Sequence, residues 1–271
     1  MEKKPETATT MRGIRIKGPP YTGELVEDYV ALESPINIYV NDNHLITLFA
    51  TPYKLEELAV GHLVGEGIIS NPKEIKEITI DGSDILVYTN TDEQKLEERI
   101  KEHARMKIIY SSCGSIEDYI RALDGIKKPR VNSDYRITAD KLFKLITQFG
   151  HGSKSFKFSI SVHTAAVYDG ESDRIIGYVE DVSRHVTVDR AVGRLLLERV
   201  NPSKAIILTT GRQASDMVLK AARAGVPITV SLRGPLFSGV YAALKTGITM
   251  ASIVRGKGLT VYSYHERIII E

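Results

Sequence analysis

The sequence predicts a mixed α/β protein, and three observations lead to that prediction. From residue 156 onward, strand-like runs alternate with helix-like runs, which is the pattern of βαβ units around a partly parallel sheet. Residues 21–90 instead show short strand pairs separated by turn signals. Of the 271 residues, 42% are hydrophobic and 26% are charged, which is ordinary for a protein with a full-sized core.

The first residues have the composition of a flexible tail. Residues 1–20 are polar, contain three prolines and lack the apolar segment of a secretory signal. We assign an N-terminal β-rich domain to residues 21–137. Two β-hairpins are predicted in it, one turning at 41–43 and the other at 81–82.

A helix is predicted over residues 52–66 within this domain. Thr51 is a suitable N-cap, and Pro52 suits the first helical position. Two glycines inside the helix weaken it, which indicates close packing against another backbone. His62 and Glu66 are spaced i, i+4, and we interpret them as a solvated pair rather than as catalytic groups.

The only cysteine, Cys113, is the strongest candidate for chemistry, because a thiolate is the best nucleophile that a protein offers near neutral pH. A charged helix is predicted over 93–104. The apolar run at 106–109 and the small residues around Cys113 are typical of a strand end that opens into a loop. The alternative is a buried structural cysteine. A single cysteine excludes an intramolecular disulfide and fits a reducing compartment.

The C-terminal α/β domain is assigned to residues 138–271. Its helices show one apolar face and usual end signals, such as Thr138 before the first helix and Gly225 after the third. The predicted strands are 156–168, 174–179, 205–209, 228–232, 248–254 and 259–264, and the predicted helices are 139–148, 188–200, 214–224 and 236–246.

Three successive turns of this domain carry an arginine next to a glycine, at Gly211-Arg212, Arg233-Gly234 and Arg255-Gly256. In open α/β sheets, ligands bind where strands end and helices begin, and arginine there favours phosphate. Each turn by itself is an ordinary polar turn. Together the turns predict a site for an extended anion such as a nucleotide, because convergent polar groups mark pockets.

Two further stretches of this domain hold candidate site residues. Residues 180–185 bring acid, base and imidazole together between a strand and a helix, which favours a site over an exposed turn. Arg184 and His185 are its main candidates. His163 lies on an apolar strand, where a histidine is more often a core residue. We include it because the charged, glycine-bearing loops surround it in sequence.

Bulk properties exclude several classes of partner. The net charge of +2 is too small to predict nucleic-acid binding. No segment approaches the roughly 18 apolar residues that a membrane span requires. We therefore expect a cytoplasmic protein that has no nucleic-acid partner and no contact with a membrane.

Six stretches of the sequence together carry a resemblance to a known family. They are TPYKLEELAVGHLVGEGII (51–69), SSCG (111–114), SVHTAAVYDG (161–170), EDVSRHVTVDRAVG (180–193), TTGRQASDMVLKAARAGVPITVS (209–231) and GITMASIVRGKGLTVY (247–262). In these stretches the chain resembles the FdhD/NarQ family. The stretches run in order through nearly the whole chain, so the resemblance is specific.

The resemblance implies a three-layer, cytidine deaminase-like α/β domain with a smaller N-terminal β-containing domain. It implies a sulfur carrier of the sulfurtransferase type, which takes persulfide sulfur from a cysteine desulfurase on Cys113. The sulfur would pass to the molybdenum or tungsten bis(guanine dinucleotide) cofactor, bis-MGD, for the maturation of formate dehydrogenase. The resemblance also implies a homodimer, and it assigns cofactor binding to Ile253, Val254, Arg255, Gly256, Lys257 and Gly258.

The chemistry of the residues agrees with a carrier of this kind. One thiolate suffices to accept persulfide sulfur, and Arg184 or His185 would lower its pKa. The turns at Gly211-Arg212 and at 255–257 supply donors for the pyrophosphates of a dinucleotide. No metal site is expected. Protein-bound zinc of the deaminase type needs a His/Cys/Cys or Cys₃ set and an H-x-E signature, which this sequence lacks.

Two alternatives stay open at this point. The first is a cofactor-binding chaperone that transfers no sulfur, because Ile116 stands where many family members carry a second cysteine. The second is a Cys-His hydrolase that pairs Cys113 with His163 or His185. The hydrolase is the weaker of the two, because the sequence shows no motif with an Asn or Asp that would orient the histidine.

Overall fold

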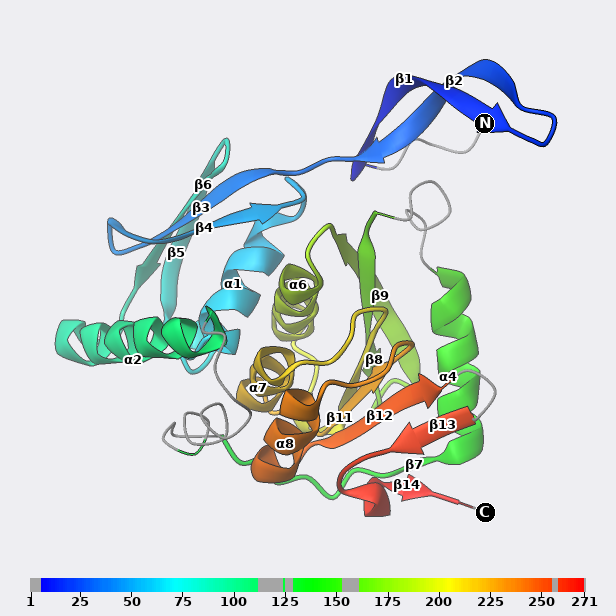
Figure 1. Ribbon diagram of the computed structural model, residues 1–271. Helices are drawn as coiled ribbons and strands as arrows, with labels where there is room; N and C mark the ends of the chain where they lie inside the picture. Colours follow the sequence, from blue (N-terminus) through cyan, green and yellow to red (C-terminus); the bar gives the residue numbers. More distant parts are fainter. Residues whose placement is uncertain (1–5, 112–123, 125–128, 153–160, 255–257, 271) are drawn as a thin grey trace.

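The computed structural model describes residues 6–111, 124, 129–152, 161–254 and 258–270, and the structural statements below concern these residues. The described strands include a six-stranded sheet, a four-stranded sheet and a two-stranded hairpin. Figure 1 shows helices on both faces of the largest sheet, and the hairpin projecting away from both larger sheets. The mixed α/β class predicted from the sequence is confirmed. Among the described helices, none is both long and apolar enough to cross a lipid bilayer.

The projecting hairpin consists of β1 (Ala8–Lys17) and β2 (Thr22–Ala31), which pair antiparallel. A flexible tail was expected over residues 1–20, and the structure instead places a strand within that segment. The prolines do not prevent strand formation, because Pro19 and Pro20 lie in the turn. Three exposed cross-strand ion pairs accompany the backbone ladder: Arg12–Glu27, Arg15–Asp28 and Lys17–Glu24.

The N-terminal sheet has the strand order β4-β3-β6-β5 and contains both predicted hairpins. The first hairpin turns at Asn41 and Asp42, which both adopt positive φ angles of 46° and 65°. Strands β3 and β6 pair in parallel in the middle of the sheet. The strands are β3 (Ser34–Val40), β4 (Asn43–Ala50), β5 (Ile75–Asp81) and β6 (Asp84–Thr89). A short 3-10 helix, Pro72–Glu74, leads into β5.

Helix α1 spans Leu55–Gly65, so it begins later than the predicted 52–66. The expected cap at Thr51 is wrong. Lys54 occupies the N-cap position in a left-handed conformation and makes no side-chain cap bond. Thr51 is instead fully buried, and its backbone N–H donates to the Asp181 carboxylate at 3.1 Å.

Helix α2 spans Glu93–Ser111 and corrects a second expectation. The apolar run at 106–109 was interpreted as the end of a strand, but its backbone continues the helix. A short apolar run does not distinguish strand from helix by periodicity, and extending an existing helix costs less than starting a new element. Cys113 lies outside the described residues.

The C-terminal sheet has the order β13-β12-β11-β10-β8-β9. Its middle strands β10, β11 and β12 run in parallel, which confirms the predicted partly parallel sheet. The strands are β8 (His163–Asp169), β9 (Arg174–Asp181), β10 (Ala205–Thr209), β11 (Ile228–Ser231), β12 (Thr249–Val254) and β13 (Gly258–Val261). A small parallel pair, β7 (Ile137–Thr138) with β14 (Ile268–Ile269), lies beside it.

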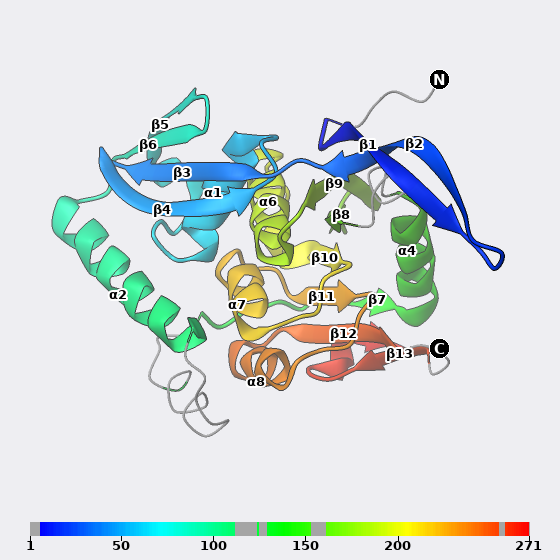
Figure 2. The ribbon, with the colours of Figure 1, turned by 45° about the horizontal axis from the view of Figure 1, so that its top comes forward.

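Helices cover both faces of this sheet and create three layers (Figures 1 and 2). Helix α4 (Ala139–Gly152) packs Leu142 and Phe149 against one face. On the other face lie α6 (Arg184–Leu197), α7 (Ser215–Arg223) and α8 (Phe237–Thr246). The cytidine deaminase-like identity of these layers stays a prediction, as does the domain boundary at residue 138.

A single buried core connects the N-terminal sheet to the C-terminal helices through the contact between α1 and α6. Gly61 of α1 faces the carbonyl oxygen of Asp189, where an added Cβ would lie only 1.7 Å away. Gly193 of α6 faces the carbonyl oxygen of Glu57 in the same way, at 1.8 Å. The predicted close packing of a helix glycine against another backbone is therefore confirmed.

We expect Gly61→Ala to destabilise the protein by about 3 kcal/mol or more, because the two helix backbones would have to separate. The measurement is the free energy of unfolding in urea. The matched control is Gly150→Ala in α4, where an added Cβ meets nothing within 4 Å. That variant should gain about 0.5–1 kcal/mol from helix propensity. Equal effects at both glycines would contradict the packing account.

Candidate functional site

One edge of the C-terminal sheet gathers most of the predicted site residues. The parallel strands β10 and β11 both end there, since Thr209 is paired with Ser231. Strand β8 starts there and β9 ends there, because His163 is paired with Asp181. The turns and helix starts that follow these strand ends meet at this edge, which we call the cationic edge and define by His163, Arg184, His185, Arg212 and Arg233.

Hydrogen bonds fix the turn that follows β10. The backbone N–H of Thr210 donates to the carbonyl of Thr164 at 2.9 Å, and the Ser231 hydroxyl donates to the carbonyl of Gly211 at 2.7 Å. A Cβ on Gly211 would lie 2.9 Å from the Cβ of Arg184. Glycine at this position therefore allows the turn to lie directly against the first turn of α6.

Electrostatics at the cationic edge favour an anionic ligand. His163 is half-buried, and its pKa is lowered first by burial and then by the positive charges of Arg184, His185, Arg233 and Arg212. The imidazole is therefore mostly neutral at pH 7, and the cations around it repel further positive charge. After burial, the largest influences on this pKa are all positively charged side chains. Three arginines, Arg184, Arg212 and Arg233, act on this one half-buried group, and guanidinium groups suit phosphate.

The remaining predicted cofactor residues lie only partly within the described chain. Ile253 and Val254 end β12 and pair with Leu259 and Gly258 of β13, at the same edge of the sheet. Ile253 packs against the core on the α4 face. Arg255, Gly256 and Lys257 lie outside the described residues, as does Cys113.

Arg184 and His185 lie in the first turn of α6, not in the loop that the sequence analysis expected. The helix was predicted from residue 188, but the Ser183 side chain caps it by accepting a hydrogen bond from the backbone N–H of Val186. The Ser183 hydroxyl is the signal that could have placed the start correctly. Because α6 begins at Arg184, the helix backbone fixes the positions of Arg184 and His185.

His185 has a partner that sequence reasoning missed. Its Nδ1 forms a hydrogen bond with a carboxylate oxygen of Asp216, in the first turn of α7. Burial alone would raise the pKa of Asp216, but the hydrogen bond and charge of His185, together with Lys220, lower it. Asp216 is therefore ionised at neutral pH, and its carboxylate accepts a hydrogen bond from Nδ1 of His185. The two residues are 31 positions apart, so no local motif reveals the pair.

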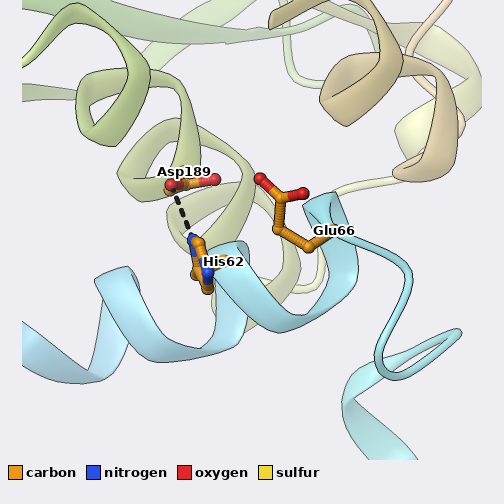
Figure 3. Close-up of side chains that lie close together, drawn as sticks. All are labelled: His62, Glu66 and Asp189. Carbon is orange, nitrogen blue, oxygen red and sulfur yellow. Dashed lines mark hydrogen bonds and ion pairs between the residues drawn. The ribbon is translucent and has the colours of Figure 1, made fainter. Parts of the chain in front are cut away.

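A buried charge cluster lies next to this pair. Lys220 contacts both Asp189, at 2.8 Å, and Glu66, at 3.2 Å. His62 bonds Asp189 through Nδ1 at 3.1 Å, and His103 of α2 pairs with Glu66 at 3.2 Å. Figure 3 shows His62 of α1, and Glu66 directly after that helix, pointing toward Asp189 of α6. The interpretation of His62 and Glu66 as a solvated pair is therefore wrong, because the His62 side chain is 2% exposed and that of Glu66 only 11% exposed.

A protonated Lys220 balances part of the negative charge of this cluster. Burial alone would lower its pKa, but Asp189, Glu66 and Asp216 raise it, so the amine stays protonated. Burial would likewise raise the pKa of Glu66, whereas Lys220 and the two histidines hold it well below its usual value.

A metal ion could in principle use His62, Glu66 and Asp189, whose ligand atoms lie within 4.8 Å of one another. The Lys220 ammonium already binds both carboxylates. A fixed cation in that position favours an ion-pair cluster over a divalent metal ion.

A cavity of about 550 Å³ opens between β4, α1, α6 and α7. It joins the His185–Asp216 pair to the buried charge cluster, and the first turn of α8 contributes to its wall. Its polar and charged lining consists of Thr47, His62, Glu66, Ser183, Arg184, His185, Asp189, Ser215, Asp216, Lys220 and Ser238. A cavity with convergent titratable groups is the usual form of a small-molecule site.

Comparisons with known proteins match the chain nearly from end to end. The model of the FdhD/NarQ family matches residues 31–269. The sulfur carrier protein FdhD of Methanothermobacter thermautotrophicus is 34% identical over 90% of this chain and 93% of its own, and that of Bacillus subtilis is 31% identical over 90% and 91%. A crystal structure from Desulfotalea psychrophila, described as a formate dehydrogenase accessory protein, has a TM-score of 0.75. It is 27% identical and covers 97% of this chain and 100% of that one.

We expect Glu66→Gln to weaken the dependence of stability on pH. The folded-state pKa of Glu66 is depressed, so its contribution is present above its unfolded pKa of about 4.3 and is lost as the pH falls through the folded value. The variant should be about 3 kcal/mol less stable at neutral pH and should lose less stability on acidification.

Urea unfolding across the acid range measures this effect. Glu97→Gln is the matched control, because Glu97 is exposed and pairs with Lys101 on the helix surface. If the free energy of unfolding falls equally steeply with acidification in Glu66→Gln and in the unsubstituted protein, Glu66 is not the group responsible.

Proposed function

Because the chain belongs to the FdhD/NarQ family, we propose that it is a sulfur carrier that serves the maturation of formate dehydrogenase. The observation that carries this proposal is the similarity to proteins named sulfur carrier protein FdhD, which extends over at least nine-tenths of their length. The structural likeness to a protein described as a formate dehydrogenase accessory protein supports formate dehydrogenase as the client. We propose a cysteine desulfurase as the sulfur donor and a homodimer as the working form.

Cys113 is the acceptor in this proposal. Its thiolate attacks the outer sulfur of a persulfide on the donor, R–S–SH. The S–S bond of the donor breaks, the donor leaves as a thiolate, and Cys113 becomes Cys113–S–SH. Atoms and charge balance, no oxidant is needed, and one cysteine is sufficient. Ile116 in place of a second cysteine is therefore compatible with the transfer.

The cationic edge is the proposed contact for the cargo, the molybdenum or tungsten bis(guanine dinucleotide) cofactor. This cofactor carries pyrophosphates, and the surroundings of His163 support the fit, because the positive charges of Arg184, Arg212 and Arg233 act on this half-buried imidazole. Gly211 leaves the turn after β10 free of a side chain that would crowd Arg184. The metal is part of the substrate here, and the side chains of the edge bind the phosphates that accompany it.

A Cys-His hydrolase is the second candidate, and one observation now favours it. Sequence analysis had found no residue to orient the histidine, and Asp216 supplies that group for His185. The discriminating experiment is covalent trapping of Cys113 by acyl electrophiles with turnover of simple esters. The chaperone alternative differs in another way, since it predicts full formate dehydrogenase activity in a strain complemented with Cys113→Ala.

We expect incubation with a cysteine desulfurase and free cysteine to add the mass of one sulfur atom to the protein. Intact-mass spectrometry measures the product, and peptide mapping should locate it on Cys113. Cys113→Ala should gain no sulfur, because the chain then contains no other thiol. A protein that stays unmodified while the desulfurase turns over would refute the carrier role.

We expect Arg212→Ala and Arg233→Ala each to weaken the binding of guanosine diphosphate by about tenfold, because each removes a charge-assisted contact to phosphate. Isothermal titration measures the affinity, which should also fall as salt is added. Arg174→Ala is the control, since Arg174 is exposed at the opposite end of β9 and its loss changes the net charge equally. Equal weakening by all three variants would indicate a general charge effect.

A further inference from the structure

We propose that the β1–β2 hairpin is a dimerisation arm, and that its apolar face binds the same face of a second copy of this chain. The apolar face consists of Ile14, Ile16 and Leu25. The inference rests on the proposed function in one respect, the homodimer, to which it assigns a contact surface. The hairpin ends at residue 31, where the match to the family model begins, so that match does not account for it.

Most of the hairpin is unsupported by the rest of the described molecule. Figure 1 shows it projecting beyond both larger sheets. Among the described elements, β1 and β2 make extensive contact only with each other. A two-stranded hairpin without a further layer is at best marginally stable in water. A partner that covers one face of the hairpin would supply that layer.

The register of the two strands separates an apolar face from a charged one. Ile14 is paired with Leu25, and Ile16 lies two residues further along β1, so the three side chains point to the same side. Ile14, Ile16 and Leu25 are 67%, 71% and 85% exposed. Single exposed apolar residues are ordinary, whereas a contiguous apolar set indicates a contact surface. The opposite side of the hairpin carries two ion pairs, Arg15–Asp28 and Lys17–Glu24.

The charges of the hairpin are sorted by strand, and this limits how two copies can meet. Every charged residue of β1 is basic, and every charged residue of β2 is acidic. Two copies that paired edge to edge around a two-fold axis would join β1 to β1 or β2 to β2. Like charges would then lie on neighbouring strands, which destabilises the pairing. The charges therefore disfavour edge-to-edge contact with a second copy.

Face-to-face contact brings opposite charges together instead. With the two-fold axis parallel to the strands, β1 of one copy lies over β2 of the other. Because Ile14 is paired with Leu25 and Arg12 with Glu27, each of these residues then faces the same partner residue in the second copy. Arg12 and Glu27 are 3.4 Å apart within the chain, and both stay mostly exposed. The apolar face and the charges at its border are therefore complementary to a second copy.

The size of the apolar face sets the strength of the contact. Three apolar side chains per copy supply less area than the roughly 800 Å² that each partner buries in a typical stable interface. We therefore expect the hairpin contact to give a reversible dimer, whose population rises with protein concentration. Substitutions on the face should then change a measurable dissociation constant.

Sedimentation equilibrium of the full chain over a range of concentrations measures this constant, with reductant present so that Cys113 forms no intermolecular disulfide. We expect Leu25→Ser to raise the dissociation constant about 100-fold, because each dimer loses two buried leucine side chains. Met11→Ser is the matched control, since Met11 is 58% exposed but is paired with Asp28 on the opposite face. It should leave the dissociation constant unchanged.

Charge reversal tests the arrangement of the two copies. We expect Arg12→Glu and Glu27→Arg each to weaken the dimer about tenfold, because each places like charges opposite one another between the copies. An equimolar mixture of the two variants should dimerise as the unsubstituted protein does, since each contact between copies then joins opposite charges. Within each variant chain residues 12 and 27 still carry like charges, so restored dimerisation in the mixture reports contact between chains.

The outcomes separate this inference from the proposed function. A dimer whose dissociation constant is unchanged by Leu25→Ser and by both charge reversals would overturn the hairpin contact and leave the homodimer standing. A protein that stays monomeric at every concentration would overturn both. A monomer that binds formate dehydrogenase through Leu25 would assign the face to the client and overturn the second copy. The sulfur-carrier role is decided separately, by the sulfur-loading measurement.

Discussion

The buried ion pair between Asp181 and Arg190 determines how the two halves of the molecule fit together. Neither side chain is exposed, and Arg190 Nε lies 3.0 Å from the Asp181 carboxylate. The guanidinium also donates to the backbone carbonyls of Thr51, Tyr53 and Lys54, in the segment that joins β4 to α1. A buried pair is tolerated only when its remaining donors and acceptors are satisfied, and here they are satisfied by that segment. The pair thereby fixes the start of α1, the end of β9 and the first half of α6 relative to one another, and these are the elements that border both the cationic edge and the cavity.

The glycine contact between α1 and α6 makes the buried charge cluster around Lys220 possible. Because the helix backbones meet at Gly61 and Gly193, Glu66 and Asp189 come close enough to share the Lys220 ammonium. Lys220 also influences Asp216, so α7 is bound to the same cluster. The orientation of His185 therefore depends on helix packing several turns away. His103 extends the cluster to α2, the helix that precedes the Cys113 segment in sequence.

Short sequence patterns predicted the hairpins, strands and helices that depend on residues close together in the sequence. The hairpins at residues 41–43 and 81–82 follow from turn chemistry, and the strand–helix alternation after residue 160 follows from hydrophobic periodicity. The convergence of Arg212, Arg233 and His163 was also predictable, because parallel strands end at the same edge. The burial of His62 was not, since its partner Asp189 is 127 residues away. Asp216 was missed for the same reason, and Thr51 resembled a helix cap because its real partner belongs to another strand.

The cationic edge and the cavity differ in charge. At the edge, the positive charges of Arg184, His185, Arg233 and Arg212 are, after burial, the largest influences that lower the pKa of His163, so positive charge predominates there and favours phosphates. In the cavity, the carboxylates of Asp216, Asp189 and Glu66 face Lys220, Arg184 and the starts of three helices, so negative and positive charges are balanced there. Arg184 belongs to both, because its Cβ approaches Gly211 and its side chain lines the cavity. His185 follows it in the same helical turn. A phosphate held at the cationic edge would therefore lie next to the helical turn that also borders the cavity.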